Sequence, residues 1–154
     1  MTFYNSIKII KLTVYPGDDV ILQCQAADPS IRAVEWRRPD LEEPEYVLLY
    51  RDGHLDPTYQ HPSYKDRVEL VDRDLKDGDV SLILKNVNKH DNGTYECRVA
   101  SGGSRRKKRG IIDSEPIRII RLQVTDLAVQ RLIHFCQVVY FPCVEVKDYM
   151  HYCV

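Results

Sequence analysis

The chain contains 154 residues, of which 44% are hydrophobic and 29% are charged, and its formal net charge is −1. This composition is ordinary for a soluble globular protein, and the length suits one domain followed by a tail. The near-neutral charge excludes a protein whose whole surface is built to bind nucleic acid, so only a local charge cluster can act electrostatically.

Short strand-like segments recur along the chain and are separated by turn signals. In chain order, these segments cover residues 7–14, 20–26, 33–38, 45–53, 66–72, 80–87, 94–100 and 116–125. Turns are indicated at residues 16–19, 52–53 and 76–79, where Gly and Asp cluster. No segment before Thr125 holds helical periodicity, so the pattern predicts an all-β sandwich.

Alternation along these segments separates a core face from an outer face. The positions expected to point inward are Val20, Leu22, Cys24, Val34, Trp36, Leu82, Leu84, Tyr95, Cys97 and Val99. On the outer face we expect Glu35 and Arg37 on one strand and Glu96 and Arg98 on its neighbour, with Tyr50 at the edge. Such a mixed-charge face suits a partner-binding surface, and the alternative is a sheet face that is only solvated.

The five cysteines fall into two groups, and their odd number leaves at least one without a partner in the same chain. Cys24 and Cys97 lie in separate strand-like segments, whereas Cys136, Cys143 and Cys153 all lie in the last twenty residues. Cysteines at inward positions of distant strands can bridge two sheets, and an intervening tryptophan can pack on the bridge. A tyrosine two residues before the second cysteine, here Tyr95, is typical of a tyrosine corner.

Together these residues resemble an immunoglobulin V-set domain, over residues 7–125. The stretches "VEWRRPD", "VLLYRDGHLDPTYQHPSYKDRVEL" and "DGDVSLILKNVNKHDNGTYEC" are similar to the butyrophilin and myelin-oligodendrocyte-glycoprotein group. The resemblance implies a V-type β-sandwich of two antiparallel sheets with Greek-key connections, a Cys24–Cys97 disulfide and an Arg67–Asp91 salt bridge. The last strand lacks the Phe-Gly-x-Gly motif of antigen receptors, which argues against a rearranged receptor chain.

The chain is expected to divide into three parts. Residues 1–6 are interpreted as the remnant of a leader, residues 7–125 as the V-set domain, and residues 126–154 as an irregular tail of uncertain structure. The first residues show no secretory signal, and the tail is too polar for a confident membrane span. Either the natural chain lacks both elements or the sequence is an incomplete gene model, so membrane attachment is implied by the resemblance only.

The densest positive cluster follows the second cysteine of the frame. It comprises Arg105, Arg106, Lys107, Lys108 and Arg109, in the position of the loop between the last two strands. We interpret it as a contact loop for an acidic partner or a sulfated glycan. The alternatives are a solvated loop without a partner, a dibasic processing site, and a nuclear localisation signal, which fits poorly with a disulfide frame.

Other motifs carry weaker signals. Asn92-Gly93-Thr94 is an acceptor motif for N-glycosylation, with a turn asparagine as the alternative. The tail residues His134, Cys136, Cys143, His151 and Cys153 do not have the spacing of a zinc site, so no metal or cofactor is expected. No nucleophile and histidine arrangement or phosphate-binding loop is present in the sequence, and we do not expect an enzyme.

The resemblance implies a function in recognition. A butyrophilin-like protein would lie on the external side of the plasma membrane, bind a receptor on another cell and modulate T-cell receptor signalling and cytokine production. Two alternatives remain open at this point, which are a homophilic adhesion domain and a soluble or incomplete fragment without a signalling role.

Overall fold

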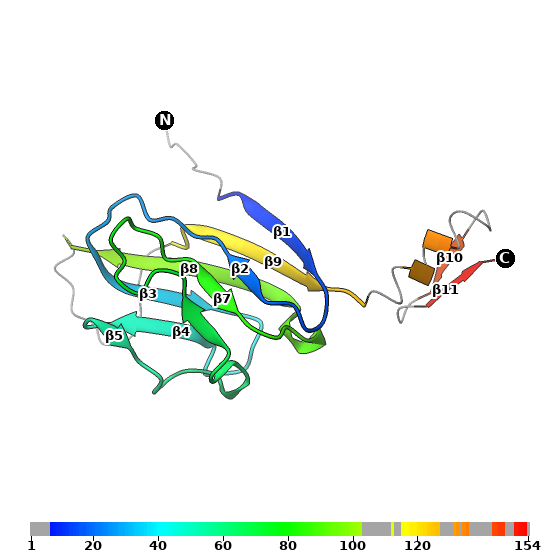
Figure 1. Ribbon diagram of the computed structural model, residues 1–154, viewed down its shortest axis with the longest axis horizontal. Coiled ribbons are helices and arrows are strands. Elements are labelled where there is room, and N and C mark those ends of the chain that lie inside the picture. Colours follow the sequence, from blue (N-terminus) through cyan, green and yellow to red (C-terminus); the bar gives the residue numbers. More distant parts are fainter. Residues whose placement is uncertain are drawn as a thin grey trace.

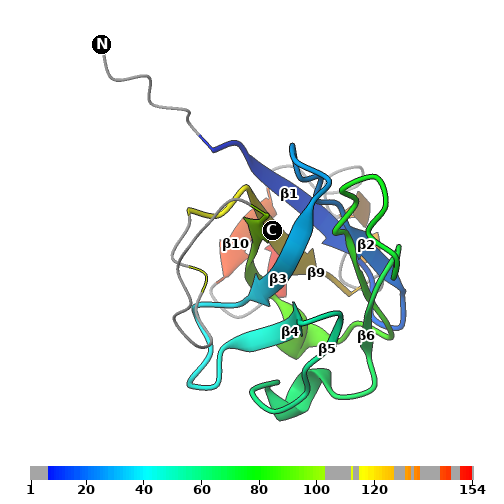
Figure 2. The same cartoon turned by 90° about the vertical axis from the view of Figure 1, so that its left-hand side faces the viewer.

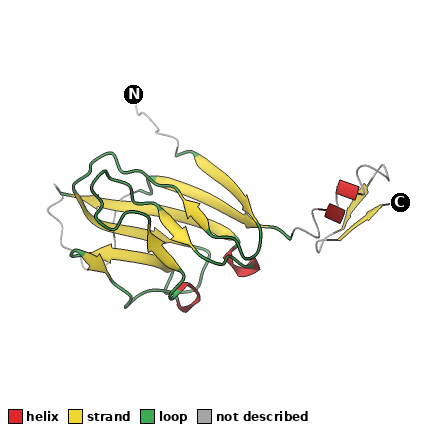
Figure 3. Cartoon of the chain, viewed as in Figure 1, coloured by secondary structure: helices red, strands yellow, loops and turns green. Residues whose placement is uncertain are grey.

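The computed structural model describes residues 7–102, 112, 115–126, 131–132, 134–135, 143–146 and 150–153. The strands are β1 (Ile9–Val14), β2 (Val20–Leu22), β3 (Ile31–Arg37), β4 (Tyr46–Arg51), β5 (His54–Leu55), β6 (Val68–Leu70), β7 (Leu82–Leu84), β8 (Gly93–Ser101), β9 (Arg118–Val124), β10 (Cys143–Val146) and β11 (Met150–Cys153). Two single-turn 3-10 helices, η1 (Pro62–Tyr64) and η2 (Lys89–Asp91), lie in the connections (Figures 1 and 3).

Strands β1 to β9 form two sheets that pack face to face. One sheet has six strands in the order β1-β9-β8-β3-β4-β5, and the other has three in the order β2-β7-β6. In Figure 2, β2 and β6 lie to one side of β3 and β4. Two packed sheets of short strands are the sandwich architecture that the sequence predicts, and the expected fold class is confirmed.

One edge of the larger sheet departs from the antiparallel pattern. β1 runs parallel to β9, with Ile9 opposite Ile119 and Val14 opposite Val124, whereas every other pair within the two sheets is antiparallel. After β1 the chain turns at Gly17, whose φ of +90° lies in the region that favours glycine, and continues as β2 in the other sheet. The first two strands therefore tie the two sheets together.

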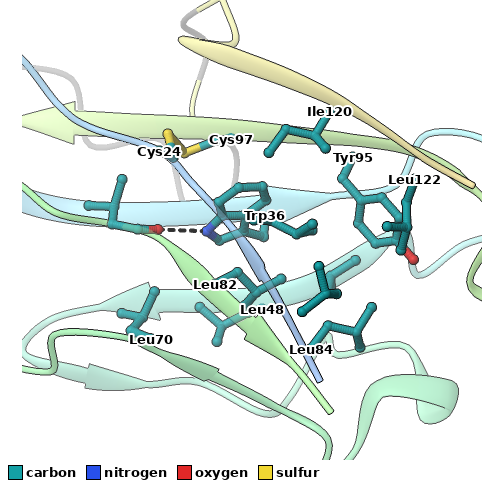
Figure 4. Packing of buried hydrophobic residues seen from close by; sticks show 14 of the residues in the cluster. Cys24, Trp36, Leu48, Leu70, Leu82, Leu84, Tyr95, Cys97, Ile120 and Leu122 are labelled. Carbon is teal, nitrogen blue, oxygen red and sulfur yellow. Dashed lines mark hydrogen bonds between the residues drawn. A yellow bond between two sulfur atoms is a disulfide. The ribbon is translucent and has the colours of Figure 1, made fainter. Parts of the chain in front are cut away.

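The core between the sheets is built around the residues expected to point inward. Trp36 is fully buried, and its indole N–H donates a hydrogen bond to the Val80 carbonyl at 2.8 Å (Figure 4). Cys24 and Cys97 are joined by a disulfide that links β8 to the segment after β2, with a Cα–Cα distance of 6.6 Å. Because a buried indole N–H needs an acceptor, this hydrogen bond fixes the ring between the two sheets.

The tail differs from the expected irregular segment. Residues 131–132 and 134–135 are helical, and β10 and β11 form an antiparallel two-stranded sheet. Neither "CVEV" nor "MHYC" has the strict alternation of apolar and polar residues that indicates a half-buried strand, so the sequence pattern did not predict this hairpin. Among the described residues, no helix has the length and apolar character needed to cross a membrane.

Candidate recognition face

The outer side of the six-stranded sheet carries four of the five sheet residues predicted to bind a partner. Antiparallel pairing places Arg98 of β8 opposite Glu35 of β3, and Glu96 opposite Arg37. Residues directly opposite one another in a ladder share a face of the sheet. We call the group formed by Glu35, Arg37, Glu96 and Arg98 the charged face.

Glu35 is not exposed on this face, which corrects its predicted role as a direct contact residue. Only 1% of its surface is accessible, and its Oε1 accepts a hydrogen bond from the backbone N–H of Ile112 at 2.9 Å. Its Oε2 has no hydrogen-bond partner among the described residues. Burial therefore raises the pKa of Glu35, although the Ile112 hydrogen bond and the nearby arginines oppose the shift. Ile112, which follows the basic run, covers Glu35, and period-two alternation cannot reveal such a contact.

Tyr50 is also misplaced by the sequence prediction. It pairs with Val34 across β3 and β4, and Val34 pairs with Val99 of β8. Val34 is fully buried, and Tyr50 packs partly buried against the same core cluster. Tyr50 therefore belongs to the inner side of the sheet, and it is not at the edge of the charged face.

The other three members of the charged face are half-buried and already have partners within the chain. Arg37 forms an ion pair with Glu45, and its guanidinium lies 5.4 Å from the centre of the Tyr46 ring. Arg98 Nη2 lies 2.9 Å from Glu96 Oε2. Half-buried side chains held by such ion pairs present their charges in a fixed geometry. This favours specific binding to a complementary surface over non-specific electrostatic binding.

A rim of aromatic and apolar side chains borders β4 and β5, and the sequence analysis did not identify it. Arg51 pairs with Asp56, and its guanidinium lies 5.8 Å from the centre of the Tyr59 ring, which is 48% exposed. Leu55 beside it is 42% exposed. The hydrogen bonds from Thr58, together with Arg51, lower the pKa of Asp56 to about 2. The pair is separated by five residues across a hairpin, and a charge pattern alone does not indicate such a contact.

The two ends of the loop between β8 and β9 are fixed to the sandwich. At one end the Gly102 N–H donates to the Ser30 carbonyl at 3.0 Å, and at the other the Ile117 N–H donates to the Cys97 carbonyl at 2.8 Å. The basic run from Arg105 to Arg109 lies outside the described residues. Ile112, which follows the basic run in the sequence, contacts Glu35 of the charged face.

The base of the sandwich holds the predicted salt bridge and the candidate glycosylation site. Arg67 Nη2 lies 2.5 Å from Asp91 Oδ2, and the Tyr95 hydroxyl donates to the Asp91 carbonyl at 2.7 Å, as a tyrosine corner does. The Asn92 amide donates from Nδ2 to the Lys89 carbonyl at 3.0 Å, and its Oδ1 accepts from the backbone of β9. Asn92 therefore joins η2 to β9, and its glycosylation stays a prediction.

A second arginine at the base was missed, although the sequence contains a signal for it. Arg38 follows Val34 and Trp36 at the same period-two parity, and it is 8% exposed. Its Nη1 donates to the Tyr64 hydroxyl at 2.9 Å and to the His90 carbonyl at 2.6 Å. A buried arginine needs several acceptors, and here they are drawn from η1 and η2.

Comparison with known proteins gives consistent results. The family model of the immunoglobulin V-set domain matches residues 10–112. The mouse (Mus musculus) selection and upkeep of intraepithelial T-cells protein 7 is 35% identical over 121 residues, which are 77% of this chain and 28% of that protein. Mouse butyrophilin-like protein 2 is 33% identical over 56% of this chain and 19% of its own length. Myelin-oligodendrocyte glycoprotein of Macaca fascicularis is 35% identical over 53% of this chain and 33% of its own length.

Solved structures agree on the fold. The human B7-H4 IgV-like domain superposes with a TM-score of 0.54 at 20% identity, covering 77% of this chain and 94% of that chain. Human T-cell immunoglobulin and mucin domain protein 1 superposes with a TM-score of 0.55 at 24% identity, covering 76% of this chain and 98% of that chain. The chain spans about a third or less of the length of the curated relatives described above.

Proposed function

Because this chain belongs to the immunoglobulin V-set family, we propose that it binds a protein receptor on another cell and thereby modulates T-cell receptor signalling and cytokine production. The similarity to butyrophilin-like protein 2, and to a protein named for the selection and upkeep of intraepithelial T-cells, supports the T-cell part of this proposal. A V-set domain recognises its partner by docking, and no bond is made or broken in the process.

The observation that carries the proposal is the charged face with its fixed ion pairs, together with the anchored ends of the loop whose sequence contains the basic run. The loop ends are anchored at Ser30 and Cys97, and Cys97 is held by the disulfide. A rigid sheet face bordered by a cationic loop can dock on a surface that complements its fixed charges, while the loop accelerates the encounter. We infer that the receptor, or a sulfated glycan beside it, presents acidic groups to Arg105–Arg109.

The proposed location is the external side of the plasma membrane. A disulfide in the core requires an oxidising compartment, which the cell surface and the secretory pathway provide. The relatives suggest attachment to the membrane, and expression of the full natural transcript with surface staining on intact cells tests that inference directly.

The receptor and glycan parts of the proposal can be tested with fluorescent multimers of the full chain. T cells would be stained with wild type and with a variant in which Arg105, Arg106 and Lys107 are changed to Gln. We expect the association rate to fall about tenfold and its dependence on salt to weaken, because charge steering is lost.

The matched control removes three charges from the other side of the sandwich. Arg73, Lys76 and Lys85 are exposed side chains that accompany the three-stranded sheet. Changing these three to Gln should leave staining unchanged. Equal losses of staining in both variants would contradict a specific role for the basic loop. If the wild-type multimer did not stain T cells, the proposal that these cells carry a receptor for the domain would be wrong.

A homophilic adhesion domain is the second candidate, because the charged face carries both signs. Arg98 and Glu96 lie side by side, so a two-fold related copy could exchange partners across an interface. Sedimentation of the purified chain over a hundredfold range of concentration separates the two readings. A monomer throughout supports binding to a receptor, and dimerisation that is lost in R98A supports adhesion.

A further inference from the structure

Two of the three tail cysteines occupy directly opposite positions in the β10–β11 hairpin. The antiparallel register pairs Cys143 with Cys153 at one end of the ladder and Val146 with Met150 at the other. Only residues 147–149 connect the two strands. This placement follows from the backbone pairing, and the sequence spacing of the cysteines did not indicate it.

The backbone spacing of such a pair meets the main requirement of a disulfide. Directly opposite residues in an antiparallel ladder have Cα atoms about 4.5 or 5.5 Å apart, depending on the hydrogen-bonding class of the pair. Disulfides join cysteines whose Cα atoms are about 4.4–6.8 Å apart. Either class of opposite pair therefore brings the two cysteines within range, without a shift of the hairpin.

The rest of the chain indicates the redox conditions that the tail meets. Cys24 and Cys97 are already joined by a disulfide in the core of the sandwich. A compartment that oxidises this pair also oxidises other cysteines that are held together and reached by the oxidant.

We propose that Cys143 and Cys153 form a second intrachain disulfide that closes the tail hairpin. The reaction is thiol–disulfide exchange with a small-molecule or protein disulfide, such as oxidised glutathione. The two cysteine thiols lose two protons and two electrons as the new S–S bond forms. The attacked disulfide takes up both electrons and both protons and leaves as two thiols.

The proposal assigns every cysteine of the chain. Five cysteines with four in two disulfides leave one thiol, which is Cys136. Cys136 lies outside the described residues, and its role here follows from counting alone. The oxidised monomer should therefore contain one free thiol, whereas a tail without a disulfide would contain three.

The test uses the full chain, secreted from eukaryotic cells or refolded with reduced and oxidised glutathione, and purified as a monomer. Free thiols are blocked under denaturing conditions and counted by mass spectrometry. The unreduced protein is then digested with trypsin and chymotrypsin, which cut after Tyr140 and after Lys147 and so separate all three tail cysteines. We expect one blocked thiol, on Cys136, and a linked pair of peptides that contain Cys143 and Cys153.

The linked peptides of Cys24 and Cys97 in the same digest show that the sample is folded and oxidised. Serine variants supply the controls. C136S should have no free thiol and keep the hairpin link, whereas C143S and C153S should each have two. Three blocked thiols in wild type, or a link from Cys136 to Cys143 or Cys153, would overturn the proposal. Neither outcome depends on receptor binding, so the test is independent of the proposed function.

Discussion

Replacing Arg38 with Met is the substitution for which the structure predicts the largest loss of stability at the base of the sandwich. The guanidinium donates hydrogen bonds to Tyr64, to the carbonyls of His90 and Asn92, and to Asp40. It also lies 5.7 Å from the centre of the Tyr95 ring. Methionine fills a similar volume but offers none of these donors.

The expected cost follows from the acceptors that lose their partner. Leaving a buried acceptor without its donor costs about 1–3 kcal/mol, and here the carbonyls of His90 and Asn92 both lose the Arg38 guanidinium. We therefore expect R38M to lower the free energy of unfolding by about 3–5 kcal/mol. The Tyr64 hydroxyl contributes less to the loss, because it keeps its hydrogen bond with the Tyr95 hydroxyl.

The neighbouring residue gives a matched control. Arg37, the last residue of β3, points to the opposite side of the sheet from Arg38, where it pairs with Glu45 and is 18% exposed. R37M should cost about 0–1 kcal/mol, as partly exposed ion pairs do. Both values are measured by urea unfolding monitored by Trp36 fluorescence, with unfolding slopes compared to confirm a common two-state transition. An R38M cost below about 1 kcal/mol, or equal to that of R37M, would refute the reasoning.

Three further predictions concern single sites. G93A should destabilise the domain by about 1–3 kcal/mol in the same unfolding assay, because a Cβ atom there would collide with the Arg38 guanidinium; an unchanged midpoint would contradict this. Asp56 has a folded-state pKa of about 2 against 3.8 for the free side chain, so its ionised form stabilises the fold above about pH 4. The advantage of wild type over D56N should therefore shrink as the pH falls from about 4 to about 2, and a constant difference across this range would argue against the Arg51 and Thr58 contacts. Burial raises the pKa of Glu35, so its ionised form costs stability above the unfolded pKa. At neutral pH, E35Q should therefore be at least as stable as wild type, and any advantage should disappear below about pH 4.5. Urea unfolding at both pH values measures the difference. A large loss of stability in E35Q at neutral pH would contradict the desolvation argument.

The arrangement of the core could be read from the sequence because it depends on simple alternation. Trp36, Leu82, Leu84, Tyr95 and Cys97 all lie at positions that period-two patterns place inward, and all five are fully buried. A strand that packs on a core through one face has an inward residue at every second position. This alternation can be recognised in the sequence without knowing which strands pair.

Errors on the candidate face arose where the alternation rule does not apply. Glu35 lies at an outward position, yet Ile112 covers it. Burial by a residue that is distant in the sequence is not indicated by the alternation within the strand. Tyr50 was expected at the edge of the outer face, although its register with Val34 puts it on the core side. Strand register depends on turns and on a bulge after Trp36, and neither could be located to the residue.

We propose that this domain recognises its partner through the outer side of the six-stranded sheet. The most direct test compares two double variants, each of which removes one ion pair. E96A/R98A removes a pair on the charged face, with an N–O distance of 2.9 Å, and E69A/K85A removes one on the three-stranded sheet, at 3.3 Å. The measurement is the concentration of full-chain multimer that half-saturates T cells in flow cytometry. We predict an increase of at least tenfold for E96A/R98A and no change for E69A/K85A. Unchanged binding by E96A/R98A, or an equal loss in both variants, would contradict the claim.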